Sequence, residues 1–118
     1  MLAVIFELEP SAGRRDDYLD LAAALRPELD NIDGFISIER FESLAQPGKL
    51  LSLSFWRDET AIARWRNLER HRNAQRAGRD GILSHYRLRV AGVIRDYGMH
   101  DRDAAPTDSR AIHEQDQG

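Results

Sequence analysis

Three residues on one predicted helix, Trp65, His71 and Arg72, carry the side chains best suited to chemistry in this chain of 118 residues. At about 100° per residue, Trp65 lies at the centre of an apolar stripe, His71 about 110° from it, and Arg72 almost on it. His71 is either a solvated or capping residue or a group that transfers protons near neutral pH. Arg72 needs an anion, either an internal carboxylate such as Glu7 or Glu39, or an acidic ligand.

Other kinds of reactive site find no support in the sequence. The chain has no cysteine, which excludes disulfides, thiolate metal sites and cysteine nucleophiles. Motifs typical of zinc proteases, nucleotide-binding loops and serine hydrolases do not occur, and His100 and His113 lack metal-ligand spacing. We therefore predict no metal site.

The composition indicates a folded domain, with 42% hydrophobic and 31% charged residues. The net charge is −3, and basic residues gather only in residues 57–79, which hold seven arginines and three acidic residues. A protein that binds nucleic acid is usually basic overall, so we expect no nucleic-acid partner. The apolar run near the amino terminus is too short for a signal peptide or a membrane span. We expect a cytoplasmic protein with no membrane partner.

Periodic patterns predict the elements that would position these residues. Alternating apolar residues predict strands over 2–9, 35–41, 50–56 and 82–97, and apolar residues three and four apart predict helices over 14–29 and from Asp58 or Glu59 to Gly78 or Gly81. The order β-α-β-β-α-β is that of the ferredoxin-like α+β fold, a four-stranded antiparallel sheet with both helices on one face. Residues 1–97 would form this domain, and residues 98–118 a polar tail that is extended or disordered.

The predicted strands are apolar on both faces, as with Ile5 beside Phe6 and Ile36 beside Phe35. In a monomer with both helices on one face, the other face would meet water. The simplest cover is the same face of a second copy, so we predict a homodimer whose sheets pack together.

The run Phe55-Trp56-Arg57-Asp58-Glu59, followed by Trp65-Arg66 and His71-Arg72 and by Tyr97 at the end of the last strand, resembles the antibiotic biosynthesis monooxygenase family. The resemblance covers about residues 1–97. It implies a dimeric α+β barrel. The family includes cofactor-independent oxygenases of aromatic substrates and haem-degrading monooxygenases, so the resemblance alone does not fix a reaction.

The resemblance implies a monooxygenase, without a cofactor, of a small aromatic substrate that reacts with oxygen as an anion. Its site would combine His71 as the base, Arg72 as the group that holds the anion, and four cavity walls: Trp65, Phe6, Phe55 and Trp56. Trp65 is also a typical core residue. One alternative is a dimeric module that binds a small hydrophobic ligand without catalysis.

The other alternative is a protein that binds or degrades haem. The haem-degrading branch has an asparagine on the first strand, a tryptophan on the second helix, and an iron-binding histidine nine or ten residues later. Trp65 fits this pattern, but Phe6 stands where the asparagine is expected, and Ala74 and Gln75 stand where the histidine is expected.

Overall fold

The computed structural model describes residues 1–71 and 81–117, apart from the side chains of residues 70, 71 and 113–117. The elements are β1 (Leu2–Pro10), α1 (Arg15–Asp30), β2 (Phe35–Glu42), β3 (Leu50–Trp56), α2 (Glu59–His71), β4 (Leu83–Gly92) and α4 (Thr107–Gln117). The first six confirm the predicted ferredoxin-like α+β order.

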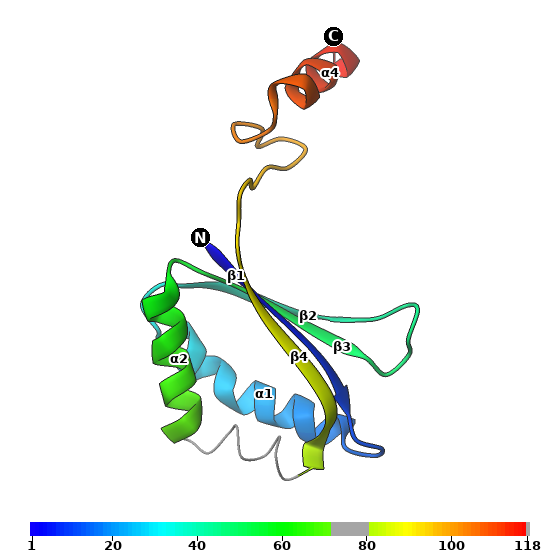
Figure 1. The fold of residues 1–118 in the computed structure, drawn as a ribbon, viewed down its shortest axis with the longest axis vertical. Helices are drawn as coiled ribbons and strands as arrows, with labels where there is room; N and C mark the ends of the chain where they lie inside the picture. The colour runs from blue at the N-terminus through cyan, green and yellow to red at the C-terminus, as the bar shows by residue number, and fades with distance from the viewer. Residues whose placement is uncertain (72–80, 118) are drawn as a thin grey trace.

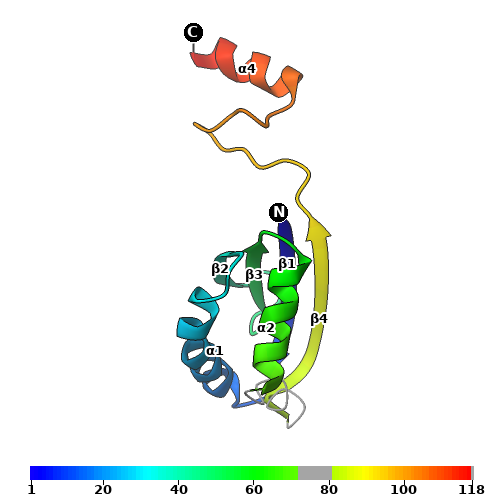
Figure 2. The same ribbon diagram turned by 90° about the vertical axis from the view of Figure 1, so that its left-hand side faces the viewer.

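The four strands form one antiparallel sheet in the order β2-β3-β1-β4. Helices α1 and α2 both lie on one side of this sheet, as Figures 1 and 2 show from two directions. We call the side of the sheet that faces the helices the covered face, and the other side the far face.

Strand register decides which residues share a face. On the covered face, Val4 pairs with Ser54 and Val90, and Phe6 pairs with Ser52 and Leu88. On the far face, Ile5 pairs with Leu53 and Arg89, and Glu7 with Leu51 and Arg87. Since side chains alternate along a strand, Phe55 belongs to the far face and Trp56 to the covered face.

The core, as far as residues 1–71 and 81–117 show it, consists of two small clusters rather than one continuous layer. The first cluster, where β1, α1, β3 and the residue just before β4 meet, is formed by Leu8, Tyr18, Leu50 and Ile82. The second is formed by Leu29, Trp56 and Ala61, with Val4, Ile32, Phe35, Ile38, Ile62 and Trp65 packed against it. Helix α1 contributes to both clusters, whereas the described part of α2 contributes to the second alone, and a space is left between the helices and the sheet.

The turn before β2 fixes the start of α2. Gly34 has a φ of +93°, and a Cβ at this position would lie 2.7 Å from the Cβ of Ala61, so a larger residue would clash. Asp58 caps α2, because its carboxylate accepts a hydrogen bond of 3.0 Å from the backbone N–H of Ala61. This hydrogen bond lowers the pKa of Asp58 below its usual value, and a hydrogen bond from the Arg57 side chain contributes a smaller part of the shift.

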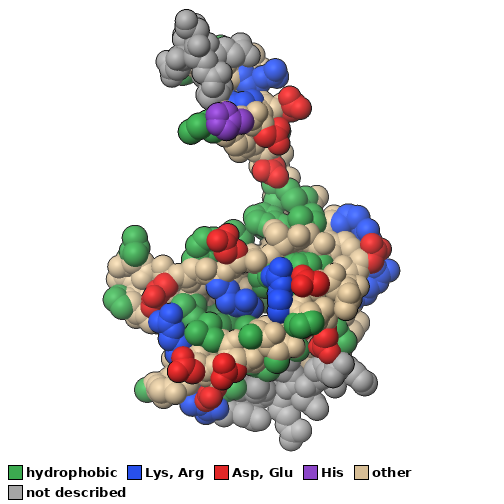
Figure 3. Space-filling view, turned by 180° about the vertical axis from the view of Figure 1, so that it is seen from behind, with side chains coloured by type: hydrophobic (Ala, Val, Ile, Leu, Met, Phe, Trp, Pro, Cys, Tyr) green, Lys and Arg blue, Asp and Glu red, His purple; other side chains and the backbone are tan. Residues whose placement is uncertain are grey.

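The end of the chain differs from the prediction in two ways. The last strand, expected over 82–97, ends at Gly92, because its partner β1 begins at Leu2 and Val93 makes the final backbone hydrogen bond, to Met1. The tail is not simply extended or disordered, since α4 forms within it. Figures 1 and 3 show α4 standing clear of the body of the molecule. No helix in the described ranges is long and apolar enough to cross a membrane.

Candidate functional site

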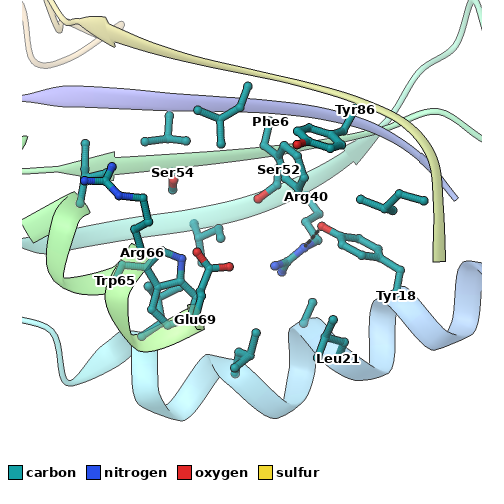
Figure 4. A pocket seen from close by; sticks show the side chains of 18 of the residues that line it. Phe6, Tyr18, Leu21, Arg40, Ser52, Ser54, Trp65, Arg66, Glu69 and Tyr86 are labelled. Carbon is teal, nitrogen blue, oxygen red and sulfur yellow. Dashed lines mark hydrogen bonds between the residues drawn. The ribbon is translucent and has the colours of Figure 1, made fainter. Parts of the chain in front are cut away.

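A cavity of about 760 Å³ lies between the covered face of the sheet and the two helices (Figure 4). Its apolar lining comes from every element of the body: Val4, Phe6, Leu21, Ala22, Leu25, Leu29, Ile38, Trp56, Ile62, Trp65, Ile82, Leu83, Leu88 and Val90. A cavity of this size and character is suited to a small apolar molecule.

On the sheet side of the cavity, β3 places two serines on the covered face, and their small side chains leave space there. Ser52 and Ser54 are both buried, and they stand opposite Phe6 and Val4 of β1. The Ser54 hydroxyl accepts a hydrogen bond of 2.9 Å from the indole N–H of Trp56. Small side chains between large ones leave room for a ligand, and the hydroxyl of Ser54 has a hydrogen-bond partner there.

Three of the four predicted wall residues border this cavity. Phe6 lies against Tyr86, with ring centroids 5.7 Å apart, and Trp65 enters from α2. Trp56 touches the cavity but is only 2% exposed and packs edge-on against Phe35, which makes it mainly a core residue. Phe55 does not line the cavity, because it follows the opposite parity of β3 and faces away from the helices.

The predicted base, His71, and the predicted anion-binding residue, Arg72, stand at the boundary between the described residues 1–71 and the residues that the structure does not describe. His71 is the last residue of α2, and its side chain lies outside the described residues, as does the whole of Arg72. Their predicted roles therefore stay predictions.

Two cationic side chains that the sequence analysis missed reach the cavity from β2 and α2. Arg40 donates a hydrogen bond of 3.3 Å from Nε to the Tyr18 hydroxyl, and its guanidinium lies 5.9 Å from the centre of the Tyr18 ring. Arg66 lines the cavity from α2. Within the described part of the chain, neither Arg40 nor Arg66 forms an ion pair.

Arg26, a third arginine at the cavity, is already engaged. It forms an ion pair of 3.2 Å with Asp30 and lies 5.5 Å from the centre of the Phe35 ring. Of the two remaining cations, Arg40 is held in place by Tyr18 and so is the better positioned to bind an anion.

Glu69, another residue that the sequence analysis missed, brings a carboxylate to the same cavity. It lies one helical turn after Trp65, is half-buried, and points toward the middle of the cavity in Figure 4. Burial raises the pKa of Glu69 to about 7, because a charged carboxylate is poorly solvated there. The cavity thus contains a group that can gain or lose a proton near neutrality.

The described residues do not fit a haem group well. His85 borders the cavity, but it pairs with Glu9 in the register of β1 and β4, so it follows the parity of the far face. Phe6, where the haem-degrading pattern has an asparagine, projects an apolar ring into the cavity. Ala74 and Gln75 lie outside the described residues. We derive no step that involves haem.

The far face has a different character. Ile5, Leu51, Leu53 and Phe55 form an apolar centre on β1 and β3, and Glu7 at its edge pairs with Arg89 at 3.4 Å and with Lys49 at 3.7 Å. Phe41 continues the apolar surface on β2 and is 42% exposed. Of the described residues that follow the parity of the far face at this apolar surface, none lines the cavity except His85, which lies at the cavity's border.

Known proteins resemble the chain in sequence and in fold. A model of the family described as "Antibiotic biosynthesis monooxygenase" matches residues 1–77. A jasmonate monooxygenase from Pyricularia oryzae is 56% identical over 93 residues, which make up 79% of this chain and 43% of that protein. The chain therefore spans less than half the length of this relative.

Solved structures share the fold at low sequence identity. Rv0793 from Mycobacterium tuberculosis has a TM-score of 0.70 and 22% identity, over 82% of this chain and 98% of that one. The haem degrader MhuD from the same organism, solved with two haems in its active site, has a TM-score of 0.60 and 17% identity, over 83% of this chain and 100% of that one. At these identities the likeness establishes the fold alone.

Proposed function

The chain belongs to the antibiotic biosynthesis monooxygenase family, and on that premise we propose that it oxidises a small substrate within the cavity. This substrate would have an apolar, aromatic body and one acidic group. The observation that carries this proposal is the combination of apolar walls with a positioned cation. Phe6 and Trp65 offer aromatic surfaces, while Arg40, oriented by Tyr18, offers a bidentate partner for a carboxylate or phenolate.

The similarity to a jasmonate monooxygenase supports an acidic substrate, since jasmonate is itself a small carboxylate. That relative is more than twice as long as the matched segment, so its activity supports the proposal only through the shared part. We therefore define the substrate by its chemistry: an apolar body with one anionic group.

The proposed reaction needs no cofactor when the substrate can become an electron-rich anion. A methylene flanked by aromatic rings, for example, loses a proton, and its carbanion gives electrons to molecular oxygen. The overall change converts CH₂ and O₂ into C=O and H₂O, so the substrate supplies all the electrons. The protein would bind the substrate, keep water away, stabilise the anion, and move the proton.

We also propose that the working protein is a homodimer in which the far faces of two copies pack together. The apolar centre made by Ile5, Leu51, Leu53 and Phe55 is suited to a sheet-on-sheet interface, and the charged groups at its edge would form the rim. The cavity lies on the opposite side of the sheet, so each copy would keep its own site.

Oxygen consumption by the purified chain tests the proposed function. A panel would contain anthrone, hydroxynaphthoates, jasmonate and the methyl esters of the acids. We expect oxygen uptake without added flavin or metal, incorporation of one atom from ¹⁸O₂, and faster turnover of acids than of their esters. Arg40→Gln should reduce that preference, whereas Arg87→Gln, which changes an arginine on the far face, should preserve it.

Two other results would contradict the proposal. Ligands that raise the melting temperature without any oxygen uptake would indicate a binding module. A Soret band on titration with hemin, together with oxygen uptake only in its presence, would indicate a haem protein.

A further inference from the structure

We infer that Glu69 accepts the substrate's proton in the cavity, while Arg40 on the opposite wall holds the anion that results. This inference rests on the proposed function and names the residue that performs its proton transfer. It differs from the expectation based on sequence, in which His71 was the base.

The placement of Glu69 on α2 is the first argument. It follows Trp65 by four residues and Ile62 by seven, so all three lie on one face of the helix, and all three line the cavity. Figure 4 shows the Glu69 carboxylate beside the Trp65 indole and directed into the open space. A ligand stacked on Trp65 would therefore meet a proton acceptor at its edge.

The surroundings of Glu69 are the second argument. The charged or titratable groups described around the cavity are Tyr18 and Arg26 on α1, Arg40 on β2, Arg66 on α2, and His85 and Tyr86 on β4. Among the described residues, none of these forms an ion pair or hydrogen bond with Glu69, and Arg26 is paired with Asp30. A half-buried carboxylate without a partner keeps its affinity for protons, which agrees with the upward shift of its pKa to about 7.

The proton and electrons balance with oxygen as the only co-reactant. Glu69 takes the proton from the substrate C–H, and the electron pair of that bond remains on carbon as an anion. The anion adds to O₂ to give a peroxide, which takes the proton back from Glu69. A second C–H proton then leaves to Glu69 as the O–O bond breaks, giving C=O and hydroxide, and hydroxide takes that proton to form water.

Proton uptake on binding tests the inference without requiring turnover. The probe is 1-naphthoate, which is fully ionised at pH 8, where most Glu69 is ionised too. Bringing a second anion into the cavity should protonate Glu69, so calorimetry in buffers of different ionisation enthalpy should show uptake approaching one proton per ligand. Glu69→Gln should abolish the uptake, and Glu59→Gln, at an exposed position of the same helix, should leave it unchanged.

Turnover supplies the second readout. With an active substrate, kcat/KM of the wild type should rise through about pH 7, the pKa of Glu69 in the free protein, whereas kcat should rise at a higher pH, because the bound anion raises that pKa. Glu69→Gln should lower kcat at least 100-fold while KM changes less than threefold. Glu69→Asp should recover part of the rate.

The two proposals fail in different ways. Binding of 1-naphthoate by the wild type without proton uptake, or a Glu69→Gln variant within threefold of the wild-type kcat, overturns the role of Glu69 and leaves the monooxygenase proposal standing. Proton uptake that depends on Glu69, in a protein that consumes oxygen with no member of the panel, supports the placement of Glu69 at the ligand and overturns the monooxygenase proposal.

Discussion

The two faces of the sheet are built from the same strands but differ in how they meet the rest of the chain. On the covered face, the buried serines of β3 lie among larger apolar residues beneath the two helices, and a cavity remains. On the far face, aliphatic residues and Phe55 form an even apolar surface with ion pairs at its edge. Figure 3 shows hydrophobic side chains visible among charged ones on the body of the molecule.

This difference shows how a small domain can separate binding from assembly. A period of two along each strand sends consecutive residues to opposite faces, so Phe55 and Trp56 serve different surfaces although they are neighbours in sequence. Substitutions on one face should therefore change ligand binding or the stability of the chain, and substitutions on the other should change association.

The largest expected effect is that of Trp56→Ala on the covered face. Trp56 is buried against Leu29, Phe35 and Ala61, and removing such a ring costs about 3–5 kcal/mol of unfolding free energy. Urea unfolding should show this loss at every protein concentration. Phe55→Ala should instead give a loss that depends on protein concentration, because it weakens the proposed interface. Equal losses that do not depend on concentration would remove the distinction between the two faces.

Leu53→Arg should break the proposed dimer. A guanidinium at the apolar centre of the far face would be desolvated by the second copy, and we expect the dissociation constant to rise at least about 100-fold, or roughly 2.7 kcal/mol. Analytical ultracentrifugation should show a shift from twice 13.5 kDa to 13.5 kDa. Ala23→Arg, at an exposed position of α1, is the control. A wild-type protein that stays at the monomer mass at micromolar concentration would contradict the dimer itself.

Glu69→Gln should change stability in a way that depends on pH. The pKa of Glu69 is about 7 in the folded chain against 4.5 for a free side chain, so the folded state binds the proton more tightly. Stability therefore falls as the pH rises from about 4.5 to about 7. The variant should be more stable than the wild type at pH 8, by on the order of 2 kcal/mol, and similar at pH 4.5. Thermal melts at the two pH values would measure this, and an equal effect at both would refute the burial of the carboxylate.

Removing residues 101–118 should have the smallest effect. α4 stands away from both faces of the sheet in Figures 1 and 2, so its loss should cost the body less than about 1 kcal/mol. Differential scanning calorimetry would detect a larger loss. A drop of several degrees in the melting temperature would show that the tail docks on the chain or on a second copy.

The sequence was sufficient to predict the strand pattern and three of the residues that border the cavity. Alternation placed β3 at Leu50–Trp56, as observed, and helical spacing placed Trp65 on the inner side of α2. The alternation of side chains along a strand could also have excluded Phe55 from the cavity wall, because its neighbour Trp56 was already assigned to that wall and consecutive residues face opposite sides.

Other features depended on distances that periodicity does not contain. Glu69 shares a helix face with Trp65, which is a readable signal, but only the separation between helix and sheet shows that this face borders a cavity rather than a packed core. Arg40 follows the parity of Ile38 on β2, yet its contact with Tyr18 joins residues 22 positions apart. In the tail, Pro106 before Thr107 and Asp108 is a helix-start signal, but the apolar spacing that usually accompanies a helix is missing.

The most direct test of the central claim, that the cavity is the ligand site, is a crystal structure of the protein with 1-naphthoate. We predict that the ring system lies against Phe6 and Trp65, with the carboxylate within hydrogen-bond distance of the Arg40 guanidinium and one edge of the ring beside Glu69. A ligand bound on the far face or on the tail, with side chains filling the space between the helices and the sheet, would contradict the account.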